Sequence, residues 1–336
     1  MFDKDAYMPG AKVVYQKNTN YKPRSEPASY AAGGKVVHVD RVEWLYIPDP
    51  ATTMNALIAG EIDFWETPSP DLVPGMEGNP DITIKVIDPL GTQGWLRPNH
   101  LNPPFDNPKA RQALLHMVKQ ADYLQAIIGD EKFWRTCGAY FMCDTPLDTD
   151  VGAGPLMNQD LEEASRLLKE GGYNGETLIL MDPTDIPVLH GASLVTAQML
   201  RKIGAKVEVQ AMDWSTLTSR RAETKSIADG GWNFFHTYST GADVASPIAN
   251  IGVSGGCVEE AWFGWPCDKT LEDLRDQFSR ESDPAKQVEI GVALQKRAYE
   301  VVPYVNYGQW FQPTAYRTSL KGVLISPVPF FWNIEK

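Results

Sequence analysis

The chain has 336 residues, of which 43% are hydrophobic and 22% are charged, and its net charge is -12 at pH 7. This composition is typical of a globular protein that is long enough for two domains. A phosphate-binding surface needs clustered Lys and Arg, and no run here is strongly basic, so we expect no nucleic-acid partner. No apolar run approaches the ~20 residues that cross a bilayer.

The first residues, MFDKDAYMPG, contain neither a basic segment nor an apolar segment, so they do not read as a signal peptide. Taken alone, this favours the cytoplasm. Residues 1–35 are rich in Pro, Gly, Ser and Tyr and are predicted to be extended. Residues 36–47 follow as a strand region, with Val42, Trp44 and Tyr46 on one face.

Residues 48–66 predict a helix, a glycine stop and a strand. Asp49 suits the N-cap and Pro50 the first helical turn. Met54, Leu57 and Ile58 then share one helical face. Gly60 stands where a helix needs a left-handed stop, and residues 62–65 have the composition of a strand.

Helices and strands alternate along the rest of the chain, so the predicted class is α/β. Predicted strands cover residues 82–87, 178–181, 207–209, 232–238, 304–307 and 323–325. The first predicted helix of this part begins at residue 108. Further helices are predicted over residues 158–171, 192–203, 217–222, 271–278 and 284–301. A proline-dense connection lies at 98–108, and a Gly- and Ser-rich loop lies at 241–264.

Four cysteines form two close pairs, Cys137 with Cys143 and Cys257 with Cys267. Neither spacing is C-x-x-C and no His lies beside either pair, so we predict no metal site. Two local disulfides fit better and would imply an oxidising compartment, which argues against the cytoplasm. Four unpaired buried thiols are the alternative.

No catalytic constellation stands out. Residues 252–256, GVSGG, match the G-x-S-x-G pattern of a hydrolase nucleophile, but that fold places its His after the serine. The last histidine here is His236, which comes before the serine. We therefore predict no enzyme and no cofactor, and retain as the alternative a hydrolase that uses dispersed carboxylates on a similar scaffold.

Aromatic residues are the positive signal. The chain has 10 Trp and 13 Tyr, and several aromatic residues fall in predicted loops. Such rings, set beside carboxylates and an arginine, could line a site for a polar organic ligand. The alternative is that most of them lie in the core. The loop aromatics considered are Tyr238, Trp262, Phe263, Trp265, Trp310 and Phe311.

Several blocks together resemble the extracytoplasmic solute-binding proteins of ABC importers, family 5, the oligopeptide- and dipeptide-binding type. Residues 49–63 resemble that family's "D…T…AL..GEID" element, and residues 99–114 resemble its "N…PPF…RQAL" block. Residues 161–173 resemble "A..LL.EAGY", with Gly171 in place of Ala. The N-terminal Pro9-Gly10 and the segment 18–21 resemble "PG…RNPDYW", with Thr19 in place of Pro.

The resemblance implies a periplasmic-binding-protein-like fold of two lobes (type II, peptide-binder cluster) that closes over a peptide or similar solute and delivers it to an ABC permease. The region from Trp232 through Tyr238 and Thr240 to Asp243 matches the part of the family in which an aspartate pairs with a ligand amino group. Asp243 is our first choice for that role, and a loop cap is its alternative. Arg220 or Arg221 is the candidate for a ligand carboxylate. Trp262 is the candidate for an aromatic wall.

The family also implies more chain before Met1, including a signal peptide. On that reading, residues 1–105 and 305–336 form a first lobe that is incomplete at its N-terminus, and residues 106–304 form the second lobe. The implied location is periplasmic or otherwise extracytoplasmic, and the implied full-length state is a monomer. A truncated fragment that binds nothing is a further alternative.

Overall fold

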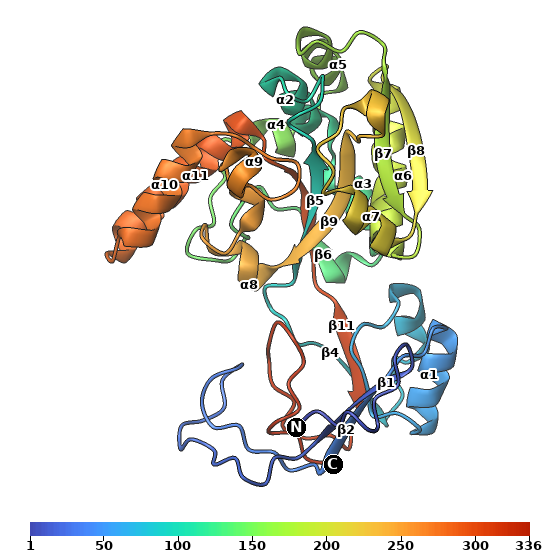
Figure 1. The fold of residues 1–336 in the computed structure, drawn as a ribbon. Helices are drawn as coiled ribbons and strands as arrows, with labels where there is room; N and C mark the ends of the chain where they lie inside the picture. The colour runs from blue at the N-terminus through green and yellow to red at the C-terminus, as the bar shows by residue number, and fades with distance from the viewer. The chain divides into compact units, whose positions relative to one another are not determined.

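The computed structural model describes residues 1–336, and the chain divides into two compact units (Figure 1). The first unit contains Met1–Gly91 and Phe311–Lys336, and the second contains Thr92–Trp310. These limits differ from the lobes predicted from the sequence, since residues 92–105 and 305–310 belong to the second unit. No helix combines the length and the apolar character that crossing a membrane requires.

The first unit is built on two small antiparallel sheets. One pairs β1 (Lys12–Gln16) with β2 (Arg41–Leu45), and the other has the order β3-β11-β4. The remaining elements of this unit are β3 (Phe64–Trp65), β4 (Ile82–Val86), β11 (Pro313–Arg317), helix α1 (Pro50–Ala59) and the 3-10 helix η1 (Pro70–Gly75).

Helix α1 confirms the predicted start and stop. The Asp49 carboxylate accepts a hydrogen bond from the Thr52 amide at 2.7 Å, and Pro50 is the first helical residue. Gly60 ends the helix with φ of 78°, in the left-handed region that favours glycine. Leu57 packs with Met76, Ile82 and Ala315 in the core between the helix and the three-stranded sheet.

The second unit contains one mixed six-stranded sheet of order β6-β10-β5-β9-β7-β8. β7 is parallel to β8 and β9, while the other pairs are antiparallel. The strands are β5 (Thr92–Pro98), β6 (Trp134–Arg135), β7 (Thr177–Pro183), β8 (Lys206–Met212), β9 (Phe234–Thr240) and β10 (Val305–Trp310).

Helices and short 3-10 turns connect these strands. The longer helices are α2 (Pro108–Met117), α3 (Gln120–Ile127), α5 (Leu161–Glu170), α6 (Pro187–Lys202), α7 (Trp214–Arg220), α10 (Lys269–Arg280) and α11 (Pro284–Val301). The shorter ones are α4 (Gly154–Met157), α8 (Gly241–Val244), α9 (Cys257–Glu260), η2 (Glu131–Phe133), η3 (Ile227–Asp229) and η4 (Ile251–Val253).

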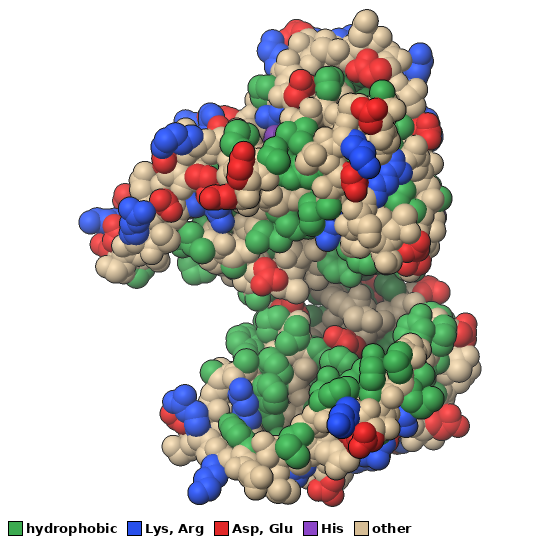
Figure 2. Space-filling model, viewed as in Figure 1, with side chains coloured by type: hydrophobic (Ala, Val, Ile, Leu, Met, Phe, Trp, Pro, Cys, Tyr) green, Lys and Arg blue, Asp and Glu red, His purple; other side chains and the backbone are tan.

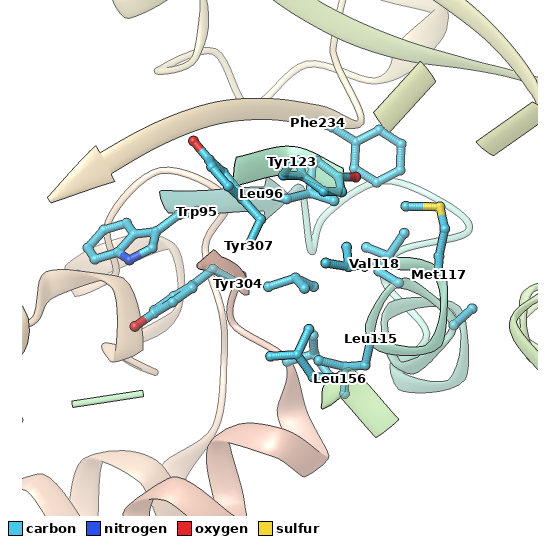
Figure 3. Packing of buried hydrophobic residues seen from close by; sticks show 14 of the residues in the cluster. Trp95, Leu96, Leu115, Met117, Val118, Tyr123, Leu156, Phe234, Tyr304 and Tyr307 are labelled. Atoms are coloured by element: carbon cyan, nitrogen blue, oxygen red, sulfur yellow. The ribbon is translucent and has the colours of Figure 1, made fainter. Parts of the chain in front are cut away.

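Strand β7 is buried on both faces. Leu178 and Leu180 of β7 join the large core cluster with residues of α6, while Ile179 and Met181 join a smaller cluster with Leu217 of α7. The side chains of a strand alternate between faces, so α6 and α7 cover opposite faces. The large cluster includes stacked rings, with centroids 4.5 Å apart for Trp95 and Tyr304 and 5.3 Å apart for Tyr123 and Tyr307 (Figure 3).

Several sequence predictions differ from these elements. Residues 323–325 form no strand, so that prediction was wrong. Strand β5 was not predicted, because Gly94 and Pro98 interrupt its apolar pattern, yet Gly94 is required there: a Cβ at this position would lie 2.0 Å from the ring of Tyr307. Helix α6 begins at Pro187, earlier than the predicted residue 192.

Candidate functional site

A disulfide-closed loop in the second unit carries three aromatic side chains. Cys257 and Cys267 are joined by a disulfide, and the loop between them contains the partly buried Trp262 and Phe263 and the buried Trp265. Cys137 and Cys143 form the second disulfide, so both predicted pairs are present and no cysteine is free. The Cys257–Cys267 bond limits the conformations that this loop can adopt in the unfolded chain. Less conformational entropy is therefore lost when the loop positions the rings of Trp262 and Phe263.

Arg97 of β5 anchors this loop from within the core. Its side chain is fully buried, and Nε donates to the Phe263 carbonyl at 2.6 Å while Nη2 donates to the Trp262 carbonyl at 3.2 Å. Nη1 donates to the carbonyls of Gly252 and Pro303. Burial lowers the pKa of Arg97 to about 9, so it remains a cation at neutral pH.

Arg221 lies among four aromatic rings on the same side of the sheet. It follows the last residue of α7, a helix capped at its start by Asp213. The distances from its guanidinium carbon to the ring centroids are 4.7 Å for Phe263, 5.0 Å for Trp262, 5.3 Å for Trp214 and 5.8 Å for Phe235. We call Arg221 and these four rings the Arg221 cage.

The guanidinium of Arg221 has no polar partner within the protein. It forms no hydrogen bond or ion pair, and its Nε is buried without an acceptor. Burial lowers the pKa of Arg221, and no neighbouring carboxylate opposes this shift. The aromatic faces offset part of the desolvation through cation–π attraction, but they supply no acceptor for the N–H donors, and the buried Nε has none at all. Such a group is suited to bind an anion.

Arg220, the other predicted arginine, is already engaged. Its Nη2 donates to the carbonyls of Gly230 at 3.2 Å and Gly231 at 3.3 Å, which ties the end of α7 to the turn before β9. The structure therefore distinguishes two arginines that are equivalent in the sequence. The structure brings two of the predicted site residues together, because the indole of Trp262 and the cation of Arg221 both belong to the Arg221 cage.

Trp232 lies in the core. It has no exposed surface, and its ring packs against Phe235 and Trp265 at 5.1 Å and 5.8 Å between centroids. It supports Phe235, one of the rings of the Arg221 cage, and its own surface is covered by protein.

Tyr238, Thr240 and Asp243 form a separate group at the far end of β9. Thr240 caps α8, and its hydroxyl donates to the Asp243 carboxylate at 2.9 Å. Tyr238 is 44% exposed and packs against Trp310, and partial burial raises its pKa. Because strand residues alternate, Tyr238 points to the face opposite Phe235 of the cage.

The G-x-S-x-G segment lacks the context of a nucleophile. Gly252 lies in the 3-10 helix η4, with no strand directly before it. The Ser254 hydroxyl donates to Glu272 at 3.3 Å, and that carboxylate also accepts from the Gly255 amide and pairs with Arg275. Nothing here activates the serine.

Sequence reasoning missed Arg97, Trp214 and Phe235 as members of this region. Trp214 lies seven residues before Arg221, a spacing that places both on one face of α7, so this neighbour could have been found from the sequence. Phe235 becomes a neighbour of Arg221 only when α7 packs on the sheet. The partners of Arg97 lie between 155 and 206 residues away along the chain, so no local pattern reports them.

The first unit has a separate apolar cavity of about 420 Å³. It is lined by both the β1–β2 sheet and the C-terminal segment, with Trp44 and Phe331 in edge-to-face contact at 5.9 Å. Figure 2 shows apolar side chains gathered on the visible face of this unit. None of the residues predicted as site residues lines this cavity.

Comparison with known proteins identifies the family. The family model of bacterial extracellular solute-binding proteins, family 5 Middle, matches residues 2–255. The probable peptide ABC transporter periplasmic-binding protein y4tO of Sinorhizobium fredii is 36% identical over 338 residues, covering 100% of this chain and 64% of the relative. The oligopeptide-binding protein AppA of Bacillus subtilis is 24% identical, covering 89% of this chain and 56% of the relative. The chain thus spans less than two thirds of the length of these relatives.

Solved structures show the same fold. The periplasmic binding protein AgaA of A. tumefaciens R10, in complex with agropinic acid, has a TM-score of 0.79 at 20% identity, covering 99% of this chain and 66% of that one. DppA of Helicobacter pylori, in complex with the peptide STSA, has a TM-score of 0.78 at 20% identity, covering 99% and 61%. The predicted α/β periplasmic-binding-protein fold is confirmed, and the chain belongs to the bacterial extracellular solute-binding proteins of family 5.

Proposed function

We propose that this chain is the solute-binding component of an ABC uptake transporter. It captures a peptide or a similar small polar solute by closure of two lobes and delivers the solute to the membrane permease. The family match over residues 2–255 carries this proposal. The relative at 36% identity is named as a probable peptide ABC transporter periplasmic-binding protein, and the relative at 24% identity as an oligopeptide-binding protein. These names support a peptide as the first ligand class to test.

The site residues add support from the chain itself. Arg221 and Trp262 offer a cation and an aromatic surface, while Asp243 and Tyr238 offer an anion and a phenol at the other end of β9. Tyr238 is three positions after Phe235, which corresponds to about 10 Å along a strand. We propose that the two groups contact different parts of the solute or act in different steps.

The proposed location is the periplasm or another extracytoplasmic compartment. Two disulfides support it, because such bonds persist in oxidising environments. We further propose a monomer, with lobes that correspond to the two units of the structure. The boundaries are then at 91/92 and 310/311 instead of 105/106 and 304/305.

The test is ligand-dependent thermal stability. A library of di- to pentapeptides and small polar solutes is added to the purified chain, and the unfolding temperature is measured with each. We expect a saturable rise with one solute class, since a ligand at 100 times its Kd stabilises by about 2.7 kcal/mol. Turnover of the same solute would favour the hydrolase alternative, and no shift with any solute would favour a non-binding fragment.

A further inference from the structure

We propose that the Arg221 cage is a subsite for a carboxylate carried on an apolar or aromatic part of the solute. The inference rests on the proposed function, and it deepens that function by naming a chemical class. It starts from a half-buried cationic group to which the protein itself offers no hydrogen-bond acceptor.

The state of Arg221 is unusual among the partly or fully buried arginines of this unit. Arg97 donates to four carbonyls and Arg111 to three. Arg275 pairs with Glu272 and donates to the Pro247 carbonyl. Arg221 has only aromatic neighbours. Desolvating a guanidinium without giving its N–H groups acceptors is costly, so an external acceptor would recover a large part of that cost.

The exposure of the three nitrogens sets the direction of approach. Nε is buried, while neither Nη1 nor Nη2 is buried without a partner, so the terminal nitrogens remain open to solvent. A carboxylate that approaches this edge can accept two parallel hydrogen bonds, one from each terminal nitrogen. A lysine at this position could not reproduce the planar pair of donors.

The surrounding rings favour an organic anion over an inorganic one. Trp214, Trp262 and Phe263 are only partly buried, so they form an apolar rim around the charged edge. A solute that carries its carboxylate on an apolar or aromatic group would bury that group against the rim. Sulfate and phosphate have no such group, so nothing would offset the cost of removing their hydration water.

The cage is held in place before any ligand arrives. Arg97 fixes the Trp262 and Phe263 carbonyls, and the Cys257–Cys267 bond closes their loop. Phe235 is fixed in β9 by pairing with Arg97 of β5 and Met181 of β7. A rigid site loses less conformational entropy on binding than a loop that must first fold.

The experiment compares benzoate with benzamide and sulfate on the full chain, by ligand-observed NMR titration. The two aromatic probes have nearly the same shape and differ in charge. We expect saturable benzoate binding in the millimolar range of a small fragment. We expect benzamide and sulfate to bind at least roughly tenfold more weakly, equivalent to 1.4 kcal/mol.

Variants assign the binding to the cage. Arg221→Gln should abolish the preference for benzoate over benzamide, and Arg221→Lys should restore only part of it. Arg201→Gln, at an exposed arginine near the end of α6, is the matched control and should bind benzoate as the unmodified chain does. Thermal unfolding of each variant shows whether it is folded, and Arg221→Lys retains the charge if Arg221→Gln does not fold.

Any of several outcomes overturns the inference: benzoate binding that survives Arg221→Gln, loss of binding through Arg220→Gln with Arg221→Gln unaffected, or equal affinity for benzoate and benzamide. Absence of benzoate binding to the unmodified chain also overturns it. The peptide and solute library tests the proposed function separately. A library solute that binds the Arg221→Gln variant as tightly as the unmodified chain would retain the transport function and reject the subsite.

Discussion

Arg97 contacts Trp262 in two ways. Its Nη2 donates to the Trp262 carbonyl at 3.2 Å, and its guanidinium carbon lies 5.3 Å from the centroid of the Trp262 indole. The same indole lies 5.0 Å from Arg221. One ring thus contacts two guanidinium groups, of which one donates to four carbonyls and the other has no polar partner in the protein.

Arg97→Met should destabilise the second unit strongly. It would leave the carbonyls of Gly252, Trp262, Phe263 and Pro303 without their buried donor, and we expect a loss of roughly 3–5 kcal/mol. Urea denaturation followed by tryptophan fluorescence measures the effect. Arg166→Met, at an exposed arginine of α5, is the control and should leave the midpoint nearly unchanged. An equally small shift for Arg97→Met would mean that the carbonyls find other donors.

Trp262 and Arg221 should be energetically coupled. We expect a double-mutant cycle of Trp262→Leu and Arg221→Gln to give a coupling free energy of about 0.5–2 kcal/mol, the range of a partly desolvated cation–π contact. Unfolding free energies of the four proteins supply the cycle. Strict additivity of the two single changes would show that the indole contributes nothing to holding the cation.

Loss of the Cys257–Cys267 bond should loosen the cage more than the sheet. The double change Cys257→Ser and Cys267→Ser reopens a short loop, and we expect a loss of roughly 2–3 kcal/mol in the loop-entropy model. The matched control removes Cys137 and Cys143, whose loop contains no cage residue. Benzoate affinity should fall in the first double variant and not in the second. Equal benzoate affinities in the two double variants would show that the Cys257–Cys267 bond does not hold the cage in place.

Acid should destabilise the second unit through His236. This residue is fully buried, with Nε2 at 2.8 Å from the Thr196 hydroxyl oxygen and Nδ1 without a partner. Burial lowers the pKa of His236 from 6.5 to about 3. Between these values the unfolded chain binds the proton more readily than the folded chain does. The free energy of unfolding is therefore not reduced by His236 above pH 6.5, and it falls as the pH falls toward 3.

The largest possible contribution of His236 is roughly 5 kcal/mol, from 1.36 kcal/mol per pKa unit. His236→Phe should flatten the dependence of unfolding free energy on pH between about 6.5 and 4. Thr196 would keep its hydrogen bond to the Tyr123 hydroxyl at 2.8 Å. His38→Gln, at a partly exposed histidine of the first unit, should leave the slope of the second unit as it is. Unchanged slopes in both variants would assign the acid sensitivity to other groups, including the buried His100.

Gly60 should tolerate asparagine better than alanine. Its φ of 78° is left-handed, and a Cβ there would meet only Arg317 atoms at 3.8 Å or more, so backbone strain is the main cost. We expect Gly60→Ala to destabilise the first unit by about 1–2 kcal/mol and Gly60→Asn by less. Gly154→Ala serves as a control, because Gly154 has no left-handed φ and open space around it. Thermal unfolding compares the three variants.

Local signals predicted helix α1 well, because Asp49, Pro50 and Gly60 act within a few residues of themselves. Strand β5 escaped prediction because it is defined by its pairing with β9 and β10, which lie far along the chain. Gly94 weakens the strand pattern in the sequence, but in the sheet it makes room for the Tyr307 ring.

In the candidate site, too, the sequence indicated residue types but not the contacts that the fold creates. Arg220 and Arg221 were both predicted as candidates for a carboxylate, because adjacent arginines cannot be ranked by sequence. Their difference arises from what each meets in the fold, carbonyls for Arg220 and aromatic rings for Arg221. Trp232 was predicted as a ligand-binding residue, but its position between Phe235 and Trp265 buries its ring. Its own indole N–H has no acceptor there.

The strand pairing of Thr92 with Trp310 has a consequence for engineering. These residues are the first and last of the second unit, and they are direct neighbours on adjacent strands. The second unit therefore begins and ends on neighbouring strands, as a domain inserted into another chain does. A short linker between Trp310 and Thr92 would close this unit into a ring, and new termini could then be opened in any exposed loop to give circular permutants.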